Sequence, residues 1–266
     1  MSRFHEQVVL NQGFNKIVKA DKGFKFINTF SILKLDEENS YDDFDTDKEA
    51  ALVILSGSCT LTSGSNTWPG LGKREDVFSG LPTCIYIPPD NKYSISSKKA
   101  EVAVCKTFCS EAHTRSITII NPEDVKINQV GRDNWSREVR IMIGPKSLSK
   151  NMIIGETLNP AGNWSGTPAH RHEKDNLPHE SLHEELYYFK TDKPQGWGIE
   201  RIYSKERNIN ELIYLGQNSV TYMPFGNHQI VAAPGYNLYY LFFLGGLGNT
   251  LAGYEDEEHN WIKQEA

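Results

Sequence analysis

The stretch Gly216-Gln-Asn-Ser-Val-Thr-Tyr-Met-Pro-Phe-Gly-Asn-His228 has a counterpart 136 residues earlier in the chain, Gly80-Leu-Pro-Thr-Cys-Ile-Tyr-Ile-Pro-Pro-Asp-Asn-Lys92. A glycine, a tyrosine, a proline and an asparagine coincide between the two stretches. The same offset places Glu49, which begins Glu-Ala-Ala-Leu-Val-Ile-Leu, on Glu185, which begins Glu-Leu-Tyr-Tyr-Phe. Because two distant segments agree at a single offset, we interpret the chain as a repeat of two similar units.

Outside these stretches the chain consists mainly of short apolar runs, rich in Val, Ile, Tyr and Phe, with Gly, Pro, Asn and Asp between them. The runs include Ala51–Leu55, Thr83–Ile87, Val102–Cys105, Met152–Leu158, Leu186–Phe189, Val220–Met223 and Leu238–Leu244. Many short strands separated by turn residues are typical of a β-sandwich or barrel. The clearest helix-like stretch, Pro122 to Asn128, is short. The sequence therefore predicts an all-β fold of two tandem barrels, residues 1–125 and residues 126–266.

The composition argues against two classes of protein. The 266 residues include 28 Lys and Arg against 34 Asp and Glu, a net charge of −6, and no stripe of basic residues is present. A nucleic-acid-binding surface needs positive charge to neutralise phosphates, so we expect no nucleic-acid partner. No apolar run approaches the roughly 20 residues of a membrane-spanning helix, so we expect no membrane partner.

Two features bear on the location of the protein. The first residues contain no apolar segment of the secretory-signal type. The cysteines show no paired spacing and are interpreted as buried free thiols of a reducing compartment. They are Cys59, Cys84, Cys105 and Cys109. We expect a cytoplasmic protein.

The sequence does not determine the oligomeric state. A homo-oligomer is compatible with barrels of this kind, which often pair through strand edges.

Histidines gather in the second half of the chain. His170 and His172 are two residues apart, and on an extended chain that spacing points both side chains to one face. Glu185 begins a strand shortly afterwards, and His228 follows a Pro-Phe-Gly turn. Three imidazoles and a carboxylate can bind a first-row divalent metal with room for water or substrate. The alternative is a set of exposed polar histidines on a loop.

These residues resemble the two motifs of the cupin superfamily, and longer stretches are similar to the bicupin family of 5-deoxy-glucuronate isomerases of inositol catabolism. The stretches that carry the resemblance are residues 155–173, Glu184-Glu-Leu-Tyr-Tyr-Phe189, Pro194-Gln-Gly-Trp-Gly198, Val231-Ala-Ala-Pro-Gly-Tyr-Asn-Leu-Tyr-Tyr240, Leu52–Gly57 and Leu71–Phe78. The family usually has Pro-Pro-His-Lys-His where this chain has Thr-Pro-Ala-His-Arg-His. His179 and His183 look like additions and are interpreted as polar loop residues.

The resemblance implies an aldose–ketose isomerase that converts 5-deoxy-D-glucuronate, a small sugar acid, into 5-dehydro-2-deoxy-D-gluconate. It also implies a metal bound by His170, His172, Glu185 and His228, for which we expect Zn²⁺, with Mn²⁺ or Fe²⁺ as alternatives. Such a reaction builds negative charge on two adjacent oxygens, and a Lewis acid stabilises that charge. Glu184 competes with Glu185 as the ligand, but cupin spacing and the repeat favour Glu185.

The remaining catalytic roles stay open between several residues. The candidates for moving the proton are a metal-bound hydroxide, Glu184 and an inward-facing tyrosine. The tyrosines considered are Tyr203, Tyr222 and Tyr240. The substrate carboxylate calls for a guanidinium, whose fork matches its two oxygens. The arginines considered are Arg171, Arg201, Arg137 and Arg140, of which Arg201, in an Ile-Glu-Arg-Ile-Tyr strand, could face inward.

The first barrel is predicted to have lost the metal site. At the repeat offset Lys92 stands in place of His228, Lys34 and Asp36 stand in place of the histidine pair, and Glu49 alone remains. We therefore expect a structural barrel without a metal. Three other functions remain as alternatives for the whole chain: a related uronate ketol-isomerase of pectin breakdown, a cupin dioxygenase that uses Fe²⁺, and a sugar-binding bicupin without catalytic activity.

Overall fold

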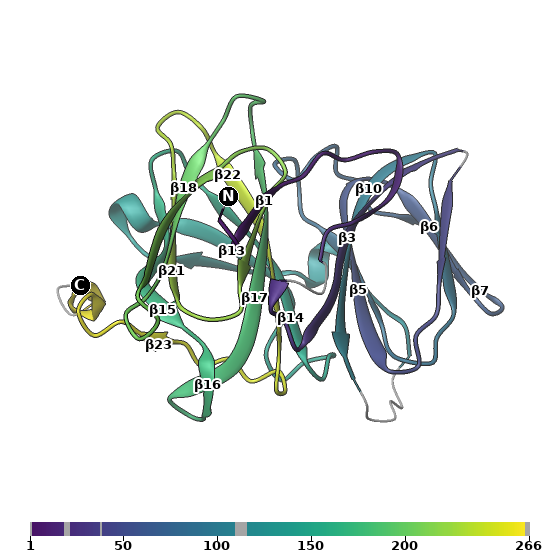
Figure 1. Cartoon of the computed structure of the whole chain (residues 1–266). Coiled ribbons are helices and arrows are strands. Elements are labelled where there is room, and N and C mark those ends of the chain that lie inside the picture. Colours follow the sequence, from purple (N-terminus) through teal and green to yellow (C-terminus); the bar gives the residue numbers. More distant parts are fainter. Residues whose placement is uncertain (1, 19–21, 38, 110–115, 264–266) are drawn as a thin grey trace.

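The computed structural model describes residues 2–18, 22–37, 39–109 and 116–263. Its regular structure is almost entirely β-strand, apart from short 3-10 turns such as η2 (Pro122–Asp124), η3 (Asp133–Trp135) and η4 (Asn260–Lys263). Two barrels lie side by side, so the prediction of an all-β fold with two tandem barrels is confirmed (Figure 1). The described residues form no helix with the length and apolar character needed to span a membrane.

The first barrel consists of two antiparallel sheets. Its strands are β2 (Gly13–Lys16), β3 (Ile27–Asp36), β4 (Ser40–Asp43), β5 (Lys48–Gly57), β6 (Cys59–Ser63), β7 (Asn66–Leu71), β8 (Thr83–Ile87), β9 (Tyr93–Ser96), β10 (Lys99–Phe108) and β11 (Thr118–Ile120). The larger sheet has the order β11-β8-β5-β10-β3-β2, and the smaller sheet has the order β4-β9-β6-β7. Buried Leu, Ile and Val side chains from both sheets, among them Leu52, Leu61 and Ile95, fill the space between them.

The second barrel repeats this plan. Its strands are β12 (Lys126–Val130), β13 (Arg137–Ile143), β14 (Met152–Asn159), β15 (Trp164–Arg171), β16 (Glu173–Asn176), β17 (Glu180–Thr191), β18 (Gly198–Ser204), β19 (Ile209–Leu215), β20 (Ser219–Met223), β21 (Asn227–Ala232), β22 (Leu238–Gly246) and β23 (Tyr254–Glu255). The smaller sheet has the order β19-β18-β21-β15-β23. The larger sheet also includes β1 (His5–Gln7) and has the order β1-β20-β17-β22-β14-β13-β12, with β16 paired to β17.

Two details differ from the sequence prediction. Strand β1 (His5–Gln7) pairs with β20, so it lies in the sheet of the second barrel and not with residues 1–125, to which the sequence assigns it. Only the first residues of the helix-like stretch, Pro122–Asp124, form a 3-10 turn, and strand β12 begins at Lys126. The rest of the domain boundary stays a prediction.

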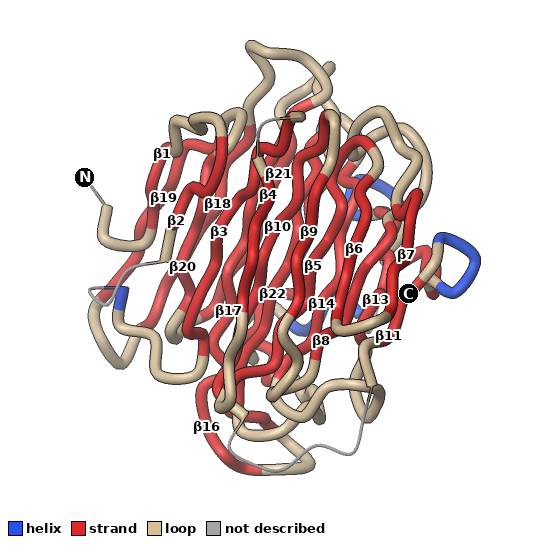
Figure 2. Tube along the Cα trace, turned by 90° about the vertical axis from the view of Figure 1, so that its right-hand side faces the viewer, coloured by secondary structure: helices blue, strands red, loops and turns tan. Residues whose placement is uncertain are grey.

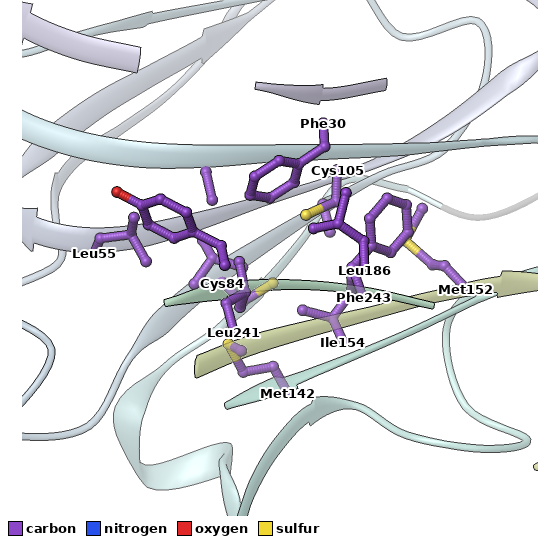
Figure 3. Close-up of a cluster of buried hydrophobic side chains, with 14 of the residues drawn as sticks. Phe30, Leu55, Cys84, Cys105, Met142, Met152, Ile154, Leu186, Leu241 and Phe243 are labelled. Atoms are coloured by element: carbon purple, nitrogen blue, oxygen red, sulfur yellow. The ribbon is translucent and has the colours of Figure 1, made fainter. Parts of the chain in front are cut away.

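Strands make up most of the chain trace, and they run roughly alongside one another (Figure 2). The larger sheets of the two barrels face each other across a shared apolar core (Figures 1 and 3). Phe30 and Cys105 from the first barrel meet Leu186 and Phe243 from the second there. Because side chains alternate along a strand, β17 contributes to two cores. Its residues Leu186 and Tyr188 enter the core between the barrels, whereas Tyr187 and Phe189 enter the interior of the second barrel.

Strand register corrects the repeat at one position. Ala50 lies opposite Ile87 on β8, and Glu185 lies opposite Met223 on β20. Ile87 and Met223 are 136 residues apart, whereas Ala50 and Glu185 are 135 apart. Ala50 therefore occupies the position of Glu185 in the first barrel, and Glu49 corresponds to Glu184.

Glu49 and Glu184 also bind alike, because each carboxylate reaches backbone of the other half of the chain. Glu49 accepts hydrogen bonds from the backbone nitrogens of Lys150 and Asn151, at 2.9 and 2.7 Å. Glu184 accepts three from the backbone of residues 25–27, at 2.6, 2.8 and 3.1 Å. The two glutamates are thus a matched pair that ties the barrels together.

Candidate metal centre

The four predicted ligands come from neighbouring strands of the second barrel. His170, near the end of β15, lies directly opposite His228 in the pairing of β15 with β21. His172 follows β15, and its backbone oxygen accepts a hydrogen bond from the backbone nitrogen of His183 on β17. Glu185 lies two residues further along β17, on the same face of the strand as Tyr187 and Phe189. Strand pairing therefore brings these side chains together inside the barrel.

A glycine turn sets the position of His228. Gly226 has a φ of +96°, a conformation that residues with a side chain rarely adopt. A Cβ atom at Gly226 would also lie 3.0 Å from the carbonyl oxygen of Tyr203. The turn therefore depends on glycine, and β21 begins at the next residue, so that His228 is buried within the barrel.

Backbone carbonyl groups orient all three imidazoles in the same way. Each Nδ1 lies close to a carbonyl oxygen, 3.3 Å from Pro168 for His170, 2.9 Å from His183 for His172 and 3.4 Å from Gly226 for His228. An Nδ1–H that donates to a carbonyl leaves the lone pair on Nε2. The three histidines thus present Nε2, the atom that a metal would bind.

Three donor atoms form a compact group. Oε2 of Glu185 lies 2.9 Å from Nε2 of His172 and 3.2 Å from Nε2 of His228, and the ligand atoms of these residues all lie within 4.8 Å of one another. His170 is outside this group, although its ring centroid is 4.9 Å from that of His228. Nε2 of His228 is buried without a hydrogen-bond partner among the described residues. An orphaned imidazole nitrogen beside a carboxylate fits a divalent metal.

The charges of the group follow from burial and from the carboxylate. Burial, together with the nearby imidazoles His228 and His172, lowers the pKa of His170 to about 3, so its ring is neutral. Burial opposes charge on His172, but the hydrogen bond and the charge of Glu185 outweigh it and raise the pKa of His172. The same two histidines hold the pKa of Glu185 below its ordinary value against the effect of burial. Glu185 is therefore ionised, as a metal ligand must be.

A cavity of about 370 Å³ opens beside this group. His170, His172 and Glu185 line it together with apolar side chains, and its polar wall includes Arg137, Tyr187 and Tyr240. The apolar lining residues include Val139, Ile141, Ile153, Phe242, Leu244 and Leu251. This is the size range of small-molecule sites, which combine apolar walls with a few polar groups.

Of the predicted catalytic tyrosines, the structure places Tyr240 in the cavity. Its hydroxyl is hydrogen-bonded to Oγ of Ser165, and its ring centroid lies 4.9 Å from that of Tyr187. Burial raises the pKa of both phenols, most strongly that of Tyr187, where the charge of Glu185 adds to the effect. Both hydroxyls are therefore protonated at neutral pH.

Three predicted residues lie away from the cavity. Glu184 binds the backbone of residues 25–27, as described above. Tyr222 lies opposite Leu186 and, like it, faces the core between the barrels, because Met223 takes the inward position opposite Glu185. Arg201 stacks 4.0 Å from the ring of Tyr203 and donates to Asn210, so it faces outward. The structure therefore places none of these three residues in the wall of the cavity.

The other tyrosine and arginines considered are also engaged elsewhere. Tyr203 donates to Asp256 at 2.6 Å. Arg171 forms ion pairs with the buried Glu180 and with the exposed Glu206. Arg140 forms an ion pair with Glu156, whose carboxylate is fully buried. That carboxylate also accepts hydrogen bonds from Nη1 and Nη2 of Arg74 in the first barrel. Only Arg137 of the four arginines considered lines the cavity.

Two residues inside this barrel are absent from the sequence predictions. Tyr187 lines the cavity, and the alternation that selects Glu185 also selects it. Glu200 on β18 is fully buried, and its carboxylate oxygens have no hydrogen-bond partner among the described residues. Burial and the charge of Glu185, opposed by the hydroxyl of Thr221, raise the pKa of Glu200 to about 8.

His183 differs from its prediction as a loop residue, whereas His179 is exposed as expected. His183 is buried on β17, with Nδ1 3.0 Å from Oγ of Ser181 and Nε2 3.1 Å from the carbonyl oxygen of Gly248. Burial, with a contribution from His172, lowers its pKa to about 4. Its own carbonyl oxygen orients His172, so His183 supports a predicted ligand.

Comparison with known proteins gives consistent matches over nearly the whole chain. The sequence profile of the KduI/IolB family matches residues 7–262. The 5-deoxy-glucuronate isomerase of Geobacillus kaustophilus is 33% identical over 220 residues, which cover 82% of this chain and 79% of that protein. The 5-deoxy-glucuronate isomerase of Bacillus subtilis is 33% identical over 236 residues, which cover 88% of this chain and 86% of that protein.

Solved structures share the fold. An IolB-like protein from Salmonella typhimurium LT2 superimposes with a TM-score of 0.93 at 23% identity, over 98% of this chain and 100% of that one. Bacillus subtilis oxalate decarboxylase, in a structure that concerns its Mn(II) centres, gives a TM-score of 0.61 at 12% identity, over 100% and 85% of the two chains. These matches support the arrangement of two barrels.

Proposed function

The chain belongs to the KduI/IolB family, and we propose that it is a 5-deoxy-glucuronate isomerase of inositol catabolism, an aldose–ketose isomerase. Its relatives of that name, each 33% identical, cover more than four fifths of the chain. The observation that carries the proposal within the structure is the group of His172, Glu185 and His228 beside a cavity whose wall includes the guanidinium of Arg137. Such a cavity suits a small sugar acid.

His170, His172, Glu185 and His228 would hold the metal, three through Nε2 and one through a carboxylate oxygen. A divalent cation supplies Lewis acidity, which stabilises the negative charge that builds on two adjacent oxygens as a carbonyl moves to the neighbouring carbon. Nitrogen and oxygen donors suit zinc, manganese and iron. The isomerisation needs no redox change at the metal, and for that reason we keep Zn²⁺ as the proposed ion.

The protein residues would exclude water and move a proton. The apolar walls keep bulk water from the reacting carbons, which strengthens electrostatic interactions in the cavity. Tyr240 is our candidate for proton transfer, because its hydroxyl lies in the cavity, is protonated and is linked to the hydroxyl of Ser165. In the reaction a proton moves from the carbon next to the aldehyde to the aldehyde carbon, and a second proton moves from the hydroxyl of that neighbouring carbon to the former aldehyde oxygen, so the substrate and the product are isomers.

The test follows the conversion of 5-deoxy-D-glucuronate by NMR in D₂O under nitrogen, with and without prior chelation, together with a measurement of bound metals. We expect anaerobic conversion that is lost on chelation and restored by Zn²⁺, with deuterium at the former aldehyde carbon. Conversion that requires oxygen would indicate the dioxygenase instead. No conversion by protein with a full complement of metal would contradict the substrate assignment and favour the pectin-type uronate or a sugar-binding role. A cytoplasmic location and a homo-oligomer remain predictions from the sequence.

A further inference from the structure

Arg137 carries a charge that no group of the described structure neutralises. It begins β13 and lines the same cavity as His170, His172 and Glu185. Its Nη1 donates to the carbonyl oxygen of Trp135 at 3.1 Å, but its Nε is buried without a hydrogen-bond partner among the described residues. No carboxylate of those residues lies within ion-pair distance of it.

The two buried arginines of the described residues are paired. Arg74 and Arg140 both bind the carboxylate of Glu156, at distances of 2.9 to 3.0 Å. Arg137 is half-buried, and its buried Nε–H lacks any such partner, which costs folding free energy because a charged donor is partly removed from water without compensation. Arg137 therefore has the character of a binding group that awaits an anion.

The orientation of Arg137 leaves one edge of the guanidinium available. Trp135 occupies Nη1, whereas Nε and Nη2 share the other edge and form no hydrogen bond to the described residues. Gly131 permits this arrangement, since a Cβ at that position would lie 2.2 Å from the oxygen of Trp135 and 2.9 Å from Nη1 of Arg137. Two parallel N–H groups on one edge match the two oxygens of a carboxylate.

Arg137 also lies close to the polar wall of the cavity. Burial raises the pKa of Tyr240, and the charge of Arg137 acts in the opposite direction as the next largest influence. A ligand anion at Arg137 would therefore sit within the same cavity as the proposed proton-transfer residue and the proposed metal ligands. The reacting end of a sugar acid and its carboxylate can then be held at once.

We propose that Arg137 binds the carboxylate of the substrate through its Nε and Nη2 edge and thereby selects sugar acids over neutral sugars. The proposal rests on the proposed function for the identity of the substrate. The requirement for a carboxylate rests on the geometry of Arg137 alone.

The kinetic test compares 5-deoxy-D-glucuronate with 5-deoxy-D-glucuronamide, its neutral isostere, for the wild type, Arg137→Met, Arg137→Lys and Arg132→Met. Arg132 is an exposed arginine nearby and serves as the control. For the acid we expect kcat/KM of Arg137→Met to fall about 100-fold or more, as for other buried charge pairs. For the amide it should change little, and Arg137→Lys should recover part of the loss. An equal loss for both substrates, or no loss for the acid, would overturn the proposal.

A binding test separates this proposal from the proposed function. The probes are the acid and the amide with the aldehyde reduced to an alcohol, which cannot isomerise, titrated by calorimetry into the zinc-loaded full chain. We expect the reduced acid to bind the wild type and Arg132→Met, but at least about 100-fold more weakly to Arg137→Met. Equal binding to all three, or none to the wild type, would overturn the role of Arg137 even if the isomerase activity were present.

The melting temperature of the ligand-free protein shows whether each variant is folded. Because Arg137 is unpaired in the described structure, we expect Arg137→Met to melt at the same temperature as the wild type or a few degrees higher. A large decrease in the melting temperature would show that Arg137 has a structural role and would overturn the proposal.

Discussion

The two barrels share one plan but differ in what fills them. In the first barrel, Leu52, Leu61 and Ile95 close the interior, and Ala50 occupies the position of Glu185. In the second barrel, a buried carboxylate, three imidazoles and a cavity of about 370 Å³ take up that space. Both barrels consist of two antiparallel sheets with corresponding strand orders, so the fold by itself does not create the site. Catalytic capacity depends on a few inward positions and on the volume left open beside them.

At the interface between the barrels, by contrast, equivalent positions carry the same residue and make the same kind of contact. Glu49 and Glu184 hold equivalent positions, and each binds backbone nitrogens across the interface. The two barrels differ at the next residue along the strand, which is Ala50 in the first barrel and Glu185 in the second. Adjacent residues of one strand therefore separate a carboxylate at the interface from the carboxylate of the proposed metal site, because they face opposite sides of the sheet.

The largest expected effect separates these neighbours on β17. Glu185→Gln removes a charged ligand, so we expect it to lose bound zinc and at least about 1,000-fold of the isomerase activity. Glu184→Gln is the matched control and should keep its metal. Metal content is measured by mass spectrometry and activity by the NMR assay. A full complement of zinc in Glu185→Gln would contradict the ligand assignment.

The second effect compares the two tyrosines that face opposite ways. Tyr240→Phe removes a hydroxyl from the cavity, and we expect kcat to fall by about 100-fold, the lower end of the contribution of acid–base catalysis. Tyr222→Phe changes a residue of the core between the barrels and should stay within about twofold of the wild type. Deuterium incorporation at the former aldehyde carbon should slow in parallel with kcat in Tyr240→Phe. Equal activities of the two variants would remove Tyr240 from the mechanism.

The third effect tests the matched anchors. Glu49→Gln and Glu184→Gln each weaken buried hydrogen bonds to backbone nitrogens, so we expect each to lower the free energy of unfolding by about 1–3 kcal/mol. Urea denaturation followed by fluorescence measures this quantity. If only one variant is destabilised, the two glutamates contribute unequally to stability. The pseudo-symmetry of the interface would then hold for the strand positions but not for the energies.

The sequence predicted the fold and the residues of the metal group because both depend on local pattern. The alternation of side chains along β17 distinguishes Glu185 from Glu184. The same alternation on the paired strand β20 places Tyr222 on the side away from the cavity. The placement of Lys34 and Asp36 on the histidine pair was wrong, because they lie on β3 in the larger sheet, whereas β15 lies in the smaller one. Connections of different length break a constant offset. The orientation of Arg137 depends on Gly131 and Trp135, and its own strand does not encode it.

The last prediction concerns Glu200, which lies opposite Ile230 between β18 and β21, where the first barrel has Leu61 opposite Ile95 between β6 and β9. Burial raises the pKa of Glu200 from its ordinary value of 4.5 to about 8. As the pH rises above 4.5 the carboxyl group ionises in the unfolded chain but not in the folded one, so ionisation favours unfolding. The stability contributed by the neutral form is complete below pH 4.5 and is lost as the pH rises through about 8.

Glu200→Gln removes this titration and keeps the shape of the side chain. Its stability relative to the wild type should therefore increase steadily between pH 4.5 and pH 8 and change little below that range. Urea denaturation of chelated protein across this pH range measures the difference. A difference that does not vary with pH would mean that Glu200 has an ordinary pKa in the folded protein. The carboxyl group would then ionise in the folded protein as it does in the unfolded chain, and its burial in the second barrel would not make the stability depend on pH.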